Sequence, residues 1–178
     1  TSDTSRVSRV VGRLRQLADV VIVSFHGGGE GLDYRRLPHG TERYLGDNRG
    51  NVRRFARLCI DRGADVVYGH GPHVVRAIEV YRGHLIAYSL GNFCTPCGIS
   101  VAGKCGLAPL LTATISRSTG RLVRGRIHSM VQGWGTGPRL DPQHRAAREI
   151  AALTEADIAK PFRPRISPDG IITPPPSQ

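Results

Sequence analysis

The chain has 178 residues, of which 39% are hydrophobic and 22% are charged, so it is a folded globular protein rather than a disordered one. Its formal net charge of +11 is carried almost wholly by arginine, which leaves open a nucleic-acid partner, an anionic polymer substrate or a bias in composition. Aromatic residues make up only 6% and no nucleic-acid-binding motif is present, so no nucleic-acid partner is expected.

The first predicted element is a helix over residues 3–18. Valine and leucine recur along one face at helical spacing, and arginines occupy most of the other positions. Asp3, Thr4 and Ser5 are all suitable residues for its N-cap. A strand over residues 19–25 follows, apolar on both faces as in a sheet that helices cover.

The next segment is predicted to contain a loop and a second helix. Residues 32–46 are polar and read as a loop, in which His39 is expected to be exposed. A helix over residues 48–62 follows, with Cys59 as a buried apolar residue and Gly63 as its end.

A histidine-bearing loop follows each of two predicted strands. The strand over residues 19–25 runs into His26 and a glycine-rich segment, and the strand over residues 64–68 runs into His70 and His73. Ligands usually bind at the carboxyl ends of strands in α/β sheets, and neutral imidazoles are ligands for zinc, manganese or iron. The two loops therefore predict a binding site at one edge of the sheet.

The second half of the chain is predicted to be mainly antiparallel. Arg82-Gly83 joins two strands, and Ser118-Thr119-Gly120 forms the turn of a hairpin. Glu79 could orient a metal-bound histidine or pair with an arginine. The predicted elements are strands over residues 74–81, 84–90, 110–116 and 121–131, a helix over residues 145–159, and an extended proline-rich tail over residues 161–178.

Three cysteines, Cys94, Cys97 and Cys105, lie in one glycine-rich loop. They could bind zinc, form a disulfide or remain free thiols. A fourth zinc ligand at the usual spacing is missing from the sequence, and the three alternatives stay open at this point.

Three motifs, taken in their order and spacing, resemble a known family. They are Ser24-Phe25-His26-Gly27-Gly28-Gly29-Glu30, Gly69-His70-Gly71-Pro72-His73-Val74 and Tyr88-Ser89-Leu90-Gly91-Asn92-Phe93. They are similar to the late motifs of the CapA family, named after poly-γ-glutamate capsule biosynthesis. The resemblance runs from about Asp19 to Asp157.

This resemblance implies an α/β fold, a metallophosphatase-like sandwich of two sheets flanked by helices. It implies His26, His70 and His73 as metal ligands, and Glu30 and Asn92 as catalytic residues, with Glu30 orienting a ligand or acting as an acid or base. The alternative for Asn92 is an ordinary turn residue. Gly27, Gly31 and Gly71 depart from the family, which commonly has aromatic residues at the first two positions and another histidine at the third.

The resemblance also implies a function. It is a metal-dependent phosphoesterase-type hydrolase of capsule or poly-γ-glutamate biosynthesis, with one or two ions of manganese, iron or zinc and an anionic polymer or phosphoester as substrate. The alternative is a non-catalytic module that binds an anionic polymer. Residues 1–160 would be the later half of the domain, the family's early motifs would precede Thr1, and the protein would lie in the cell envelope, with membrane association possible through that upstream region.

Overall fold

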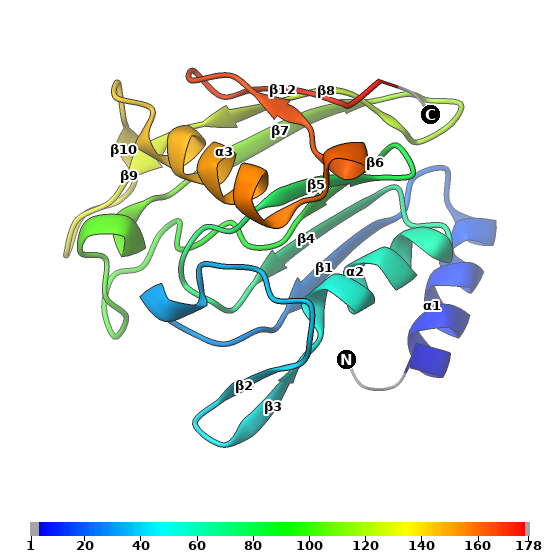
Figure 1. Cartoon of the computed structure of the whole chain (residues 1–178), viewed down its shortest axis with the longest axis horizontal. Coiled ribbons are helices and arrows are strands. Elements are labelled where there is room, and N and C mark those ends of the chain that lie inside the picture. Colours follow the sequence, from blue (N-terminus) through cyan, green and yellow to red (C-terminus); the bar gives the residue numbers. More distant parts are fainter. Residues whose placement is uncertain (1–3, 177–178) are drawn as a thin grey trace.

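A computed structural model describes residues 4–176, which form a mixed α/β structure with two four-stranded sheets (Figure 1). The first sheet has the strand order β1-β4-β6-β5 and the second has the order β11-β12-β8-β7. Two short two-stranded sheets, β2-β3 and β9-β10, complete the strands. The predicted α/β class is confirmed.

Both histidine loops belong to the first sheet, in which β1, β4 and β6 run parallel to one another. Strands β1 (Ile22–His26) and β4 (Val66–His70) are parallel and in register, so that His26 is the partner of His70. Strand β6 (His84–Ala87) is parallel to β4, and β5 (Ile78–Tyr81) is antiparallel to β6 across the predicted Arg82-Gly83 turn. Both histidine loops therefore leave the same edge of one sheet.

Helices α1 (Thr4–Leu17) and α2 (Val52–Asp61) lie together on one side of this sheet (Figure 1). The expected helix over residues 3–18 is confirmed, although the N-cap candidate Asp3 lies outside the described residues. Its apolar face is covered less than expected: Val11 is buried, whereas Leu14 and Leu17 are 44% and 72% exposed. Strand β1 is an edge strand, so within residues 4–176 no further strand of this sheet lies beyond it for these side chains to pack against.

The predicted polar loop over residues 32–46 is instead a 3₁₀ turn and a hairpin. The turn spans Leu32–Tyr34, and the hairpin joins β2 (Glu42–Tyr44) to β3 (Asp47–Gly50). The expected helix start at residue 48 was wrong because these residues pair as β3. Leu45 and Gly46 both have positive φ, which is the backbone of a tight two-residue turn.

The second sheet begins with the predicted hairpin. Strands β7 (Leu110–Ile115) and β8 (Leu122–His128) pair antiparallel. The strand predicted over residues 121–131 ends at His128, and β9 (Met130–Val131) pairs separately with β10 (Arg139–Leu140). Helix α3 (Arg145–Asp157) contacts β5 of the first sheet and β8 and β11 of the second.

The segment after residue 160 differs from the extended tail that its prolines indicated. It forms a 3₁₀ turn (Lys160–Phe162) and the strands β11 (Arg165–Ile166) and β12 (Ile171–Thr173), and β12 pairs with β8. Ile172 is completely buried in the core. The prolines lie on either side of these short strands, where the loss of an N–H group costs no ladder hydrogen bond.

The four cysteines are free thiols in very different surroundings. Cys59 is buried on α2, and burial raises the pKa of its thiol to about 11 from an ordinary value of 9.0. Cys94 and Cys97 are exposed, and Cys105 is buried. The expected burial of Cys59 is confirmed.

Two thiols should therefore react quickly with an alkylating reagent at pH 8. Cys94 and Cys97 are accessible, whereas Cys59 is both buried and protonated at that pH, and the thiolate is the reactive form. Mass mapping after brief treatment with iodoacetamide should find label on Cys94 and Cys97 and almost none on Cys59. Rapid labelling of Cys59 in the native protein would contradict this placement of α2.

Candidate functional site

The two histidine loops meet through backbone contacts that glycines make. The amide of Gly27 donates to the carbonyl of His70 at 3.0 Å, and the amide of Gly31 donates to the carbonyl of Pro72 at 2.9 Å. Gly71 has φ +121°, and a Cβ atom there would lie 2.7 Å from the carbonyl oxygen of Gly27. This packing leaves no room for a side chain at position 71.

His73 is held by Asn92 at two points. The side-chain amide of Asn92 donates to the backbone carbonyls of His73 and Cys105, at 3.1 and 3.3 Å. Its Oδ1 atom lies 2.9 Å from Nδ1 of His73 and must accept there, so Nδ1 carries a proton and, in the neutral imidazole, Nε2 is the nitrogen that can act as a ligand. Asn92 is 5% exposed, and its side chain contacts both the ring and the backbone of His73.

The ring of His73 lies near both the carboxylate of Glu30 and the ring of His26. Nε2 of His73 lies 3.9 Å from Oε2 of Glu30, and the ring centroids of His26 and His73 are 6.3 Å apart. Three of the predicted site residues thus lie together at the strand ends. The Glu30 side chain is 27% exposed, so solvent or a substrate can reach it.

His70 occupies a different place in the same loop. Its Nδ1 atom lies 3.4 Å from the carbonyl oxygen of Gly91, and its ring packs at a right angle against Tyr68 with centroids 5.8 Å apart. The segment that contains Gly91 and Asn92 therefore contacts both His70 and His73. Within residues 4–176, no group of three or more His, Cys, Asp or Glu side chains is arranged so that it could hold a metal ion.

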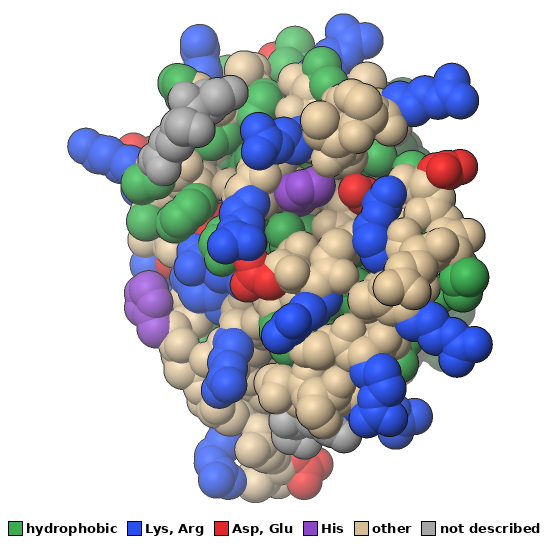
Figure 2. Space-filling model, turned by 90° about the vertical axis from the view of Figure 1, so that its right-hand side faces the viewer, with side chains coloured by type: hydrophobic (Ala, Val, Ile, Leu, Met, Phe, Trp, Pro, Cys, Tyr) green, Lys and Arg blue, Asp and Glu red, His purple; other side chains and the backbone are tan. Residues whose placement is uncertain are grey.

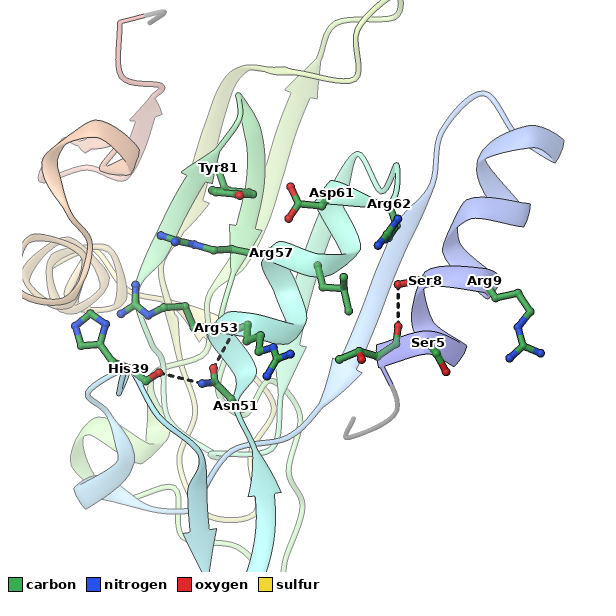
Figure 3. Close-up of a pocket in the computed structure, with 13 residues that line it drawn as sticks. Ser5, Ser8, Arg9, His39, Asn51, Arg53, Arg57, Asp61, Arg62 and Tyr81 are labelled. Atoms are coloured by element: carbon green, nitrogen blue, oxygen red, sulfur yellow. Dashed lines mark hydrogen bonds between the residues drawn. The ribbon is translucent and has the colours of Figure 1, made fainter.

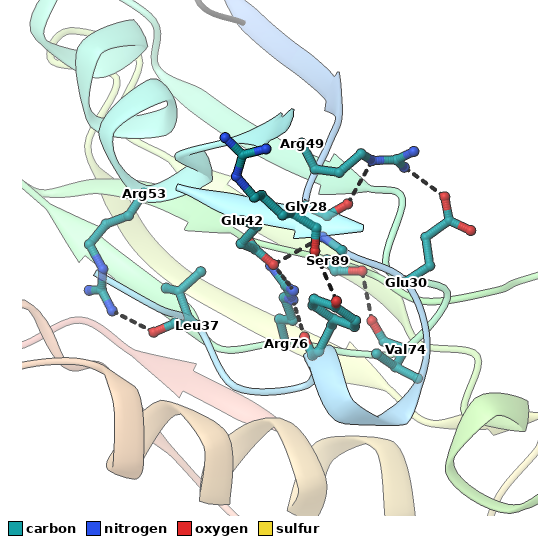
Figure 4. A network of polar contacts seen from close by, with 12 residues as sticks. Gly28, Glu30, Leu37, Glu42, Arg49, Arg53, Val74, Arg76 and Ser89 are labelled. Carbon is teal, nitrogen blue, oxygen red and sulfur yellow. Dashed lines mark hydrogen bonds and ion pairs between the residues drawn. The ribbon is translucent and has the colours of Figure 1, made fainter. Parts of the chain in front are cut away.

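Arg49, on strand β3, was missed in the sequence and fixes Glu30. Its guanidinium donates to the carboxylate of Glu30 at 2.7 Å and to the carbonyl of Gly28 at 3.0 Å (Figure 4). Because the hairpin was read as a loop and a helix start, the sequence offered no reason to place Arg49 near the site.

A buried ion pair between Arg76 and Glu42 lies beneath the glycine loop (Figure 4). Arg76 is completely buried, Glu42 is 5% exposed, and two nitrogens of Arg76 donate to the two carboxylate oxygens at 2.9 and 2.6 Å. Glu42 also accepts the amide of Gly29 at 3.0 Å, and Arg76 donates to the carbonyl of Tyr34 at 2.7 Å. The pair thereby ties the hairpin and the loop after His26 to the segment after His73.

Glu79 is part of a buried polar cluster, and His39 lies at the surface. Glu79 is completely buried, forms an ion pair with Arg57 and accepts the hydroxyl of Tyr88 at 2.5 Å. Of the two alternatives for Glu79, the arginine pair is the one found. His39 is exposed, as predicted.

A family model supports the relationship that the three motifs indicated. The model for the bacterial capsule synthesis protein PGA_cap matches residues 1–96, which include all three motifs. The chain belongs to this family.

Individual members of the family match over a shorter stretch. The chain is 39% identical over 84 residues to the PGA biosynthesis protein CapA of Bacillus subtilis, which is 47% of this chain and 19% of that protein. It is 38% identical over 76 residues to the capsule biosynthesis protein CapA of Bacillus anthracis, covering 43% of this chain and 15% of that protein. A probable polyglutamine synthesis accessory protein of Mycobacterium tuberculosis is 39% identical over 74 residues, which are 42% of this chain and 16% of that protein. The chain thus matches less than a fifth of the length of these relatives.

Proposed function

We propose that the chain belongs to a protein of capsule or poly-γ-glutamate synthesis and carries part of a metal-dependent phosphoesterase-type site in a metallophosphatase-like fold. Family membership and the names of the relatives support the role in synthesis. The observation that carries the hydrolase proposal is the meeting of His26, Glu30 and His73 at the ends of parallel strands, with Nε2 of His73 left free by Asn92.

The imidazoles of His26, His70 and His73 would hold a divalent ion of manganese, iron or zinc, or a pair of them. Such an ion would polarise a phosphoryl oxygen and lower the pKa of a bound water. The described residues supply only part of a ligand set, and the free edge of β1 offers a place for more. A further parallel strand added there would bring its carboxyl end next to His26.

The other residues of the site position these histidines or move protons. Asn92 fixes the tautomer of His73 by accepting from Nδ1. Glu30, held by Arg49, would take or give a proton at its exposed carboxylate. The buried pair of Arg76 and Glu42 would keep the two loops at a fixed separation.

The metal content of the full-length protein tests this proposal. Elemental analysis after reconstitution with manganese, iron and zinc should find stoichiometric metal, and replacing His26, His70 and His73 together with alanine should abolish it. The matched control replaces His39, His128 and His144, three histidines outside the site, and should keep the metal. Hydrolysis of a simple phosphoester should stop on addition of a chelator and in His70→Ala.

Two results would overturn the proposal of a hydrolase. The first is equal metal content in the two triple variants, and the second is phosphoester hydrolysis that survives His70→Ala. A protein that binds no metal under any of these conditions would instead favour a non-catalytic module for an anionic polymer, which the net charge of +11 supports independently.

A further inference from the structure

A pocket of about 990 Å³ lies over the outer side of α2, and none of the histidine-site residues lines it. Its walls come from α2, the first turns of α1, His39 and Tyr81 (Figure 3). Five arginines and one aspartate line the pocket, so its charged side chains are overwhelmingly basic. Basic side chains are also widespread on the neighbouring face that carries α1 (Figure 2).

Most of this positive charge is not neutralised by the protein. Within residues 4–176, Arg9, Arg54 and Arg62 line the pocket without forming an ion pair. Asp61, the one carboxylate in the wall, already pairs with Arg82 at 3.1 Å. The pocket therefore presents guanidinium groups whose donors are available to an anion.

Arg53 places a further positive charge at the inner wall of the pocket. It is only 8% exposed, and its Nη2 atom donates to the backbone carbonyls of Leu37 and Asp157, at 3.3 and 3.0 Å. Its buried Nε atom has no hydrogen-bond partner in the described part of the chain. Because this atom is out of reach of solvent and Nη2 is engaged by two carbonyls, Arg53 contributes its positive charge to the pocket rather than a free donor.

The position of these arginines on α2 also favours an anion. Asn51 caps the helix by accepting the amide of Arg54 at 2.8 Å, and the first turn contains Arg53 and Arg54 but no acidic residue. Cations are unfavourable at a helix N-terminus because the helix dipole is positive there. A bound anion would turn this unfavourable pair of charges into a favourable one.

We propose that this pocket binds a flexible acidic polymer without aromatic bases, at a site separate from His26, His70 and His73. Arg54, in the first turn of α2, and Arg62, its C-cap residue, are eight residues apart, a span of about 12 Å along the helix axis, which suits an extended ligand better than a single small anion. The identification of the polymer as an acidic capsule polymer rests on the proposed function.

A nucleic acid fits this pocket less well. Tyr81 is the aromatic residue in the wall, and its ring is already stacked by Arg57, with 4.8 Å between the guanidinium carbon and the ring centroid. Arg82 lies 5.8 Å from the same centroid. Binding of single strands relies on aromatic rings that are free to stack on bases.

Binding of polyglutamate of defined length, followed by fluorescence anisotropy, tests the proposal. Arg54→Glu combined with Arg62→Glu should weaken binding at least tenfold in about 0.1 M salt. The matched control, Arg117→Glu combined with Arg124→Glu, makes the same change in net charge on exposed arginines of the β7–β8 hairpin and should change affinity less than threefold. Affinity of the unchanged protein should fall steeply with salt.

Three outcomes would overturn the proposal: equal losses in the two double variants, no binding of polyglutamate, or equally tight binding of a single-stranded oligonucleotide of the same charge. Thermal unfolding of each variant confirms that it is folded. Metal content is measured on the same samples, so that failure of the histidine site and failure of the arginine pocket are seen separately. Polyphosphate serves as a second acidic polymer, and tighter binding of polyphosphate than of polyglutamate would show that the site prefers phosphates to carboxylates.

Discussion

Replacing Glu42 with alanine is expected to destabilise the protein by about 3–5 kcal/mol. The change leaves the guanidinium of Arg76, which is completely buried, without its carboxylate, and it removes the acceptor of the Gly29 amide. For a domain of this size the loss corresponds to a decrease of about 10 °C in Tm. Urea unfolding at pH 7 measures it directly.

The control for this prediction is an exposed ion pair. Asp61→Ala breaks the contact with Arg82, whose side chain is 66% exposed, and should cost about 0–1 kcal/mol. The double variant Glu42→Leu/Arg76→Met removes both charges and should recover much of the stability lost in Glu42→Ala. If Glu42→Ala unfolds at the same urea concentration as Asp61→Ala, the buried pair does not hold the loops together.

Replacing Gly71 with alanine should damage both the fold and the site. The new methyl group would lie within 2.7–2.9 Å of backbone atoms of Gly27, and φ +121° is unfavourable for any residue with a Cβ atom. The loop after β1 would have to move away from the loop after β4. We expect a loss of stability at least about 2 kcal/mol greater than for a glycine that has positive φ alone.

Gly31→Ala is that control. Gly31 has φ +93° in the loop after β1, but a Cβ atom there would meet nothing within 4 Å. It therefore measures the backbone strain without the clash. Equal destabilisation by the two substitutions would show that the contact between the two loops is loose, and metal content of the full-length protein would show whether the histidines have separated.

The sequence predicted the histidine loops well because their signals are local. A run of β-branched residues followed by glycine and histidine marks β1 and β4, and parallel pairing then brings His26 and His70 to one edge of the sheet. The three helices and the two later hairpins were predicted for the same reason, since hydrophobic periodicity and turn residues are properties of neighbouring positions.

The supporting residues escaped prediction because their partners are distant in the sequence. Glu42 lies 34 residues from Arg76, and β2 and β3 lack the alternation of apolar residues that marks a strand. A signal was nevertheless present. Arg76 and Glu79 interrupt an otherwise apolar run from Val74 to Tyr81, and charges at such positions indicate buried ion pairs.

The position of β12 has a consequence for how the protein folds during its synthesis. This strand lies between β11 and β8, and it brings the fully buried Ile172 into the core. Strand β8 can gain its second neighbour only after the ribosome has made residues 171–173. Until then the hairpin of β7 and β8 leaves one edge unpaired, and the nascent chain is exposed to intermolecular association at that edge.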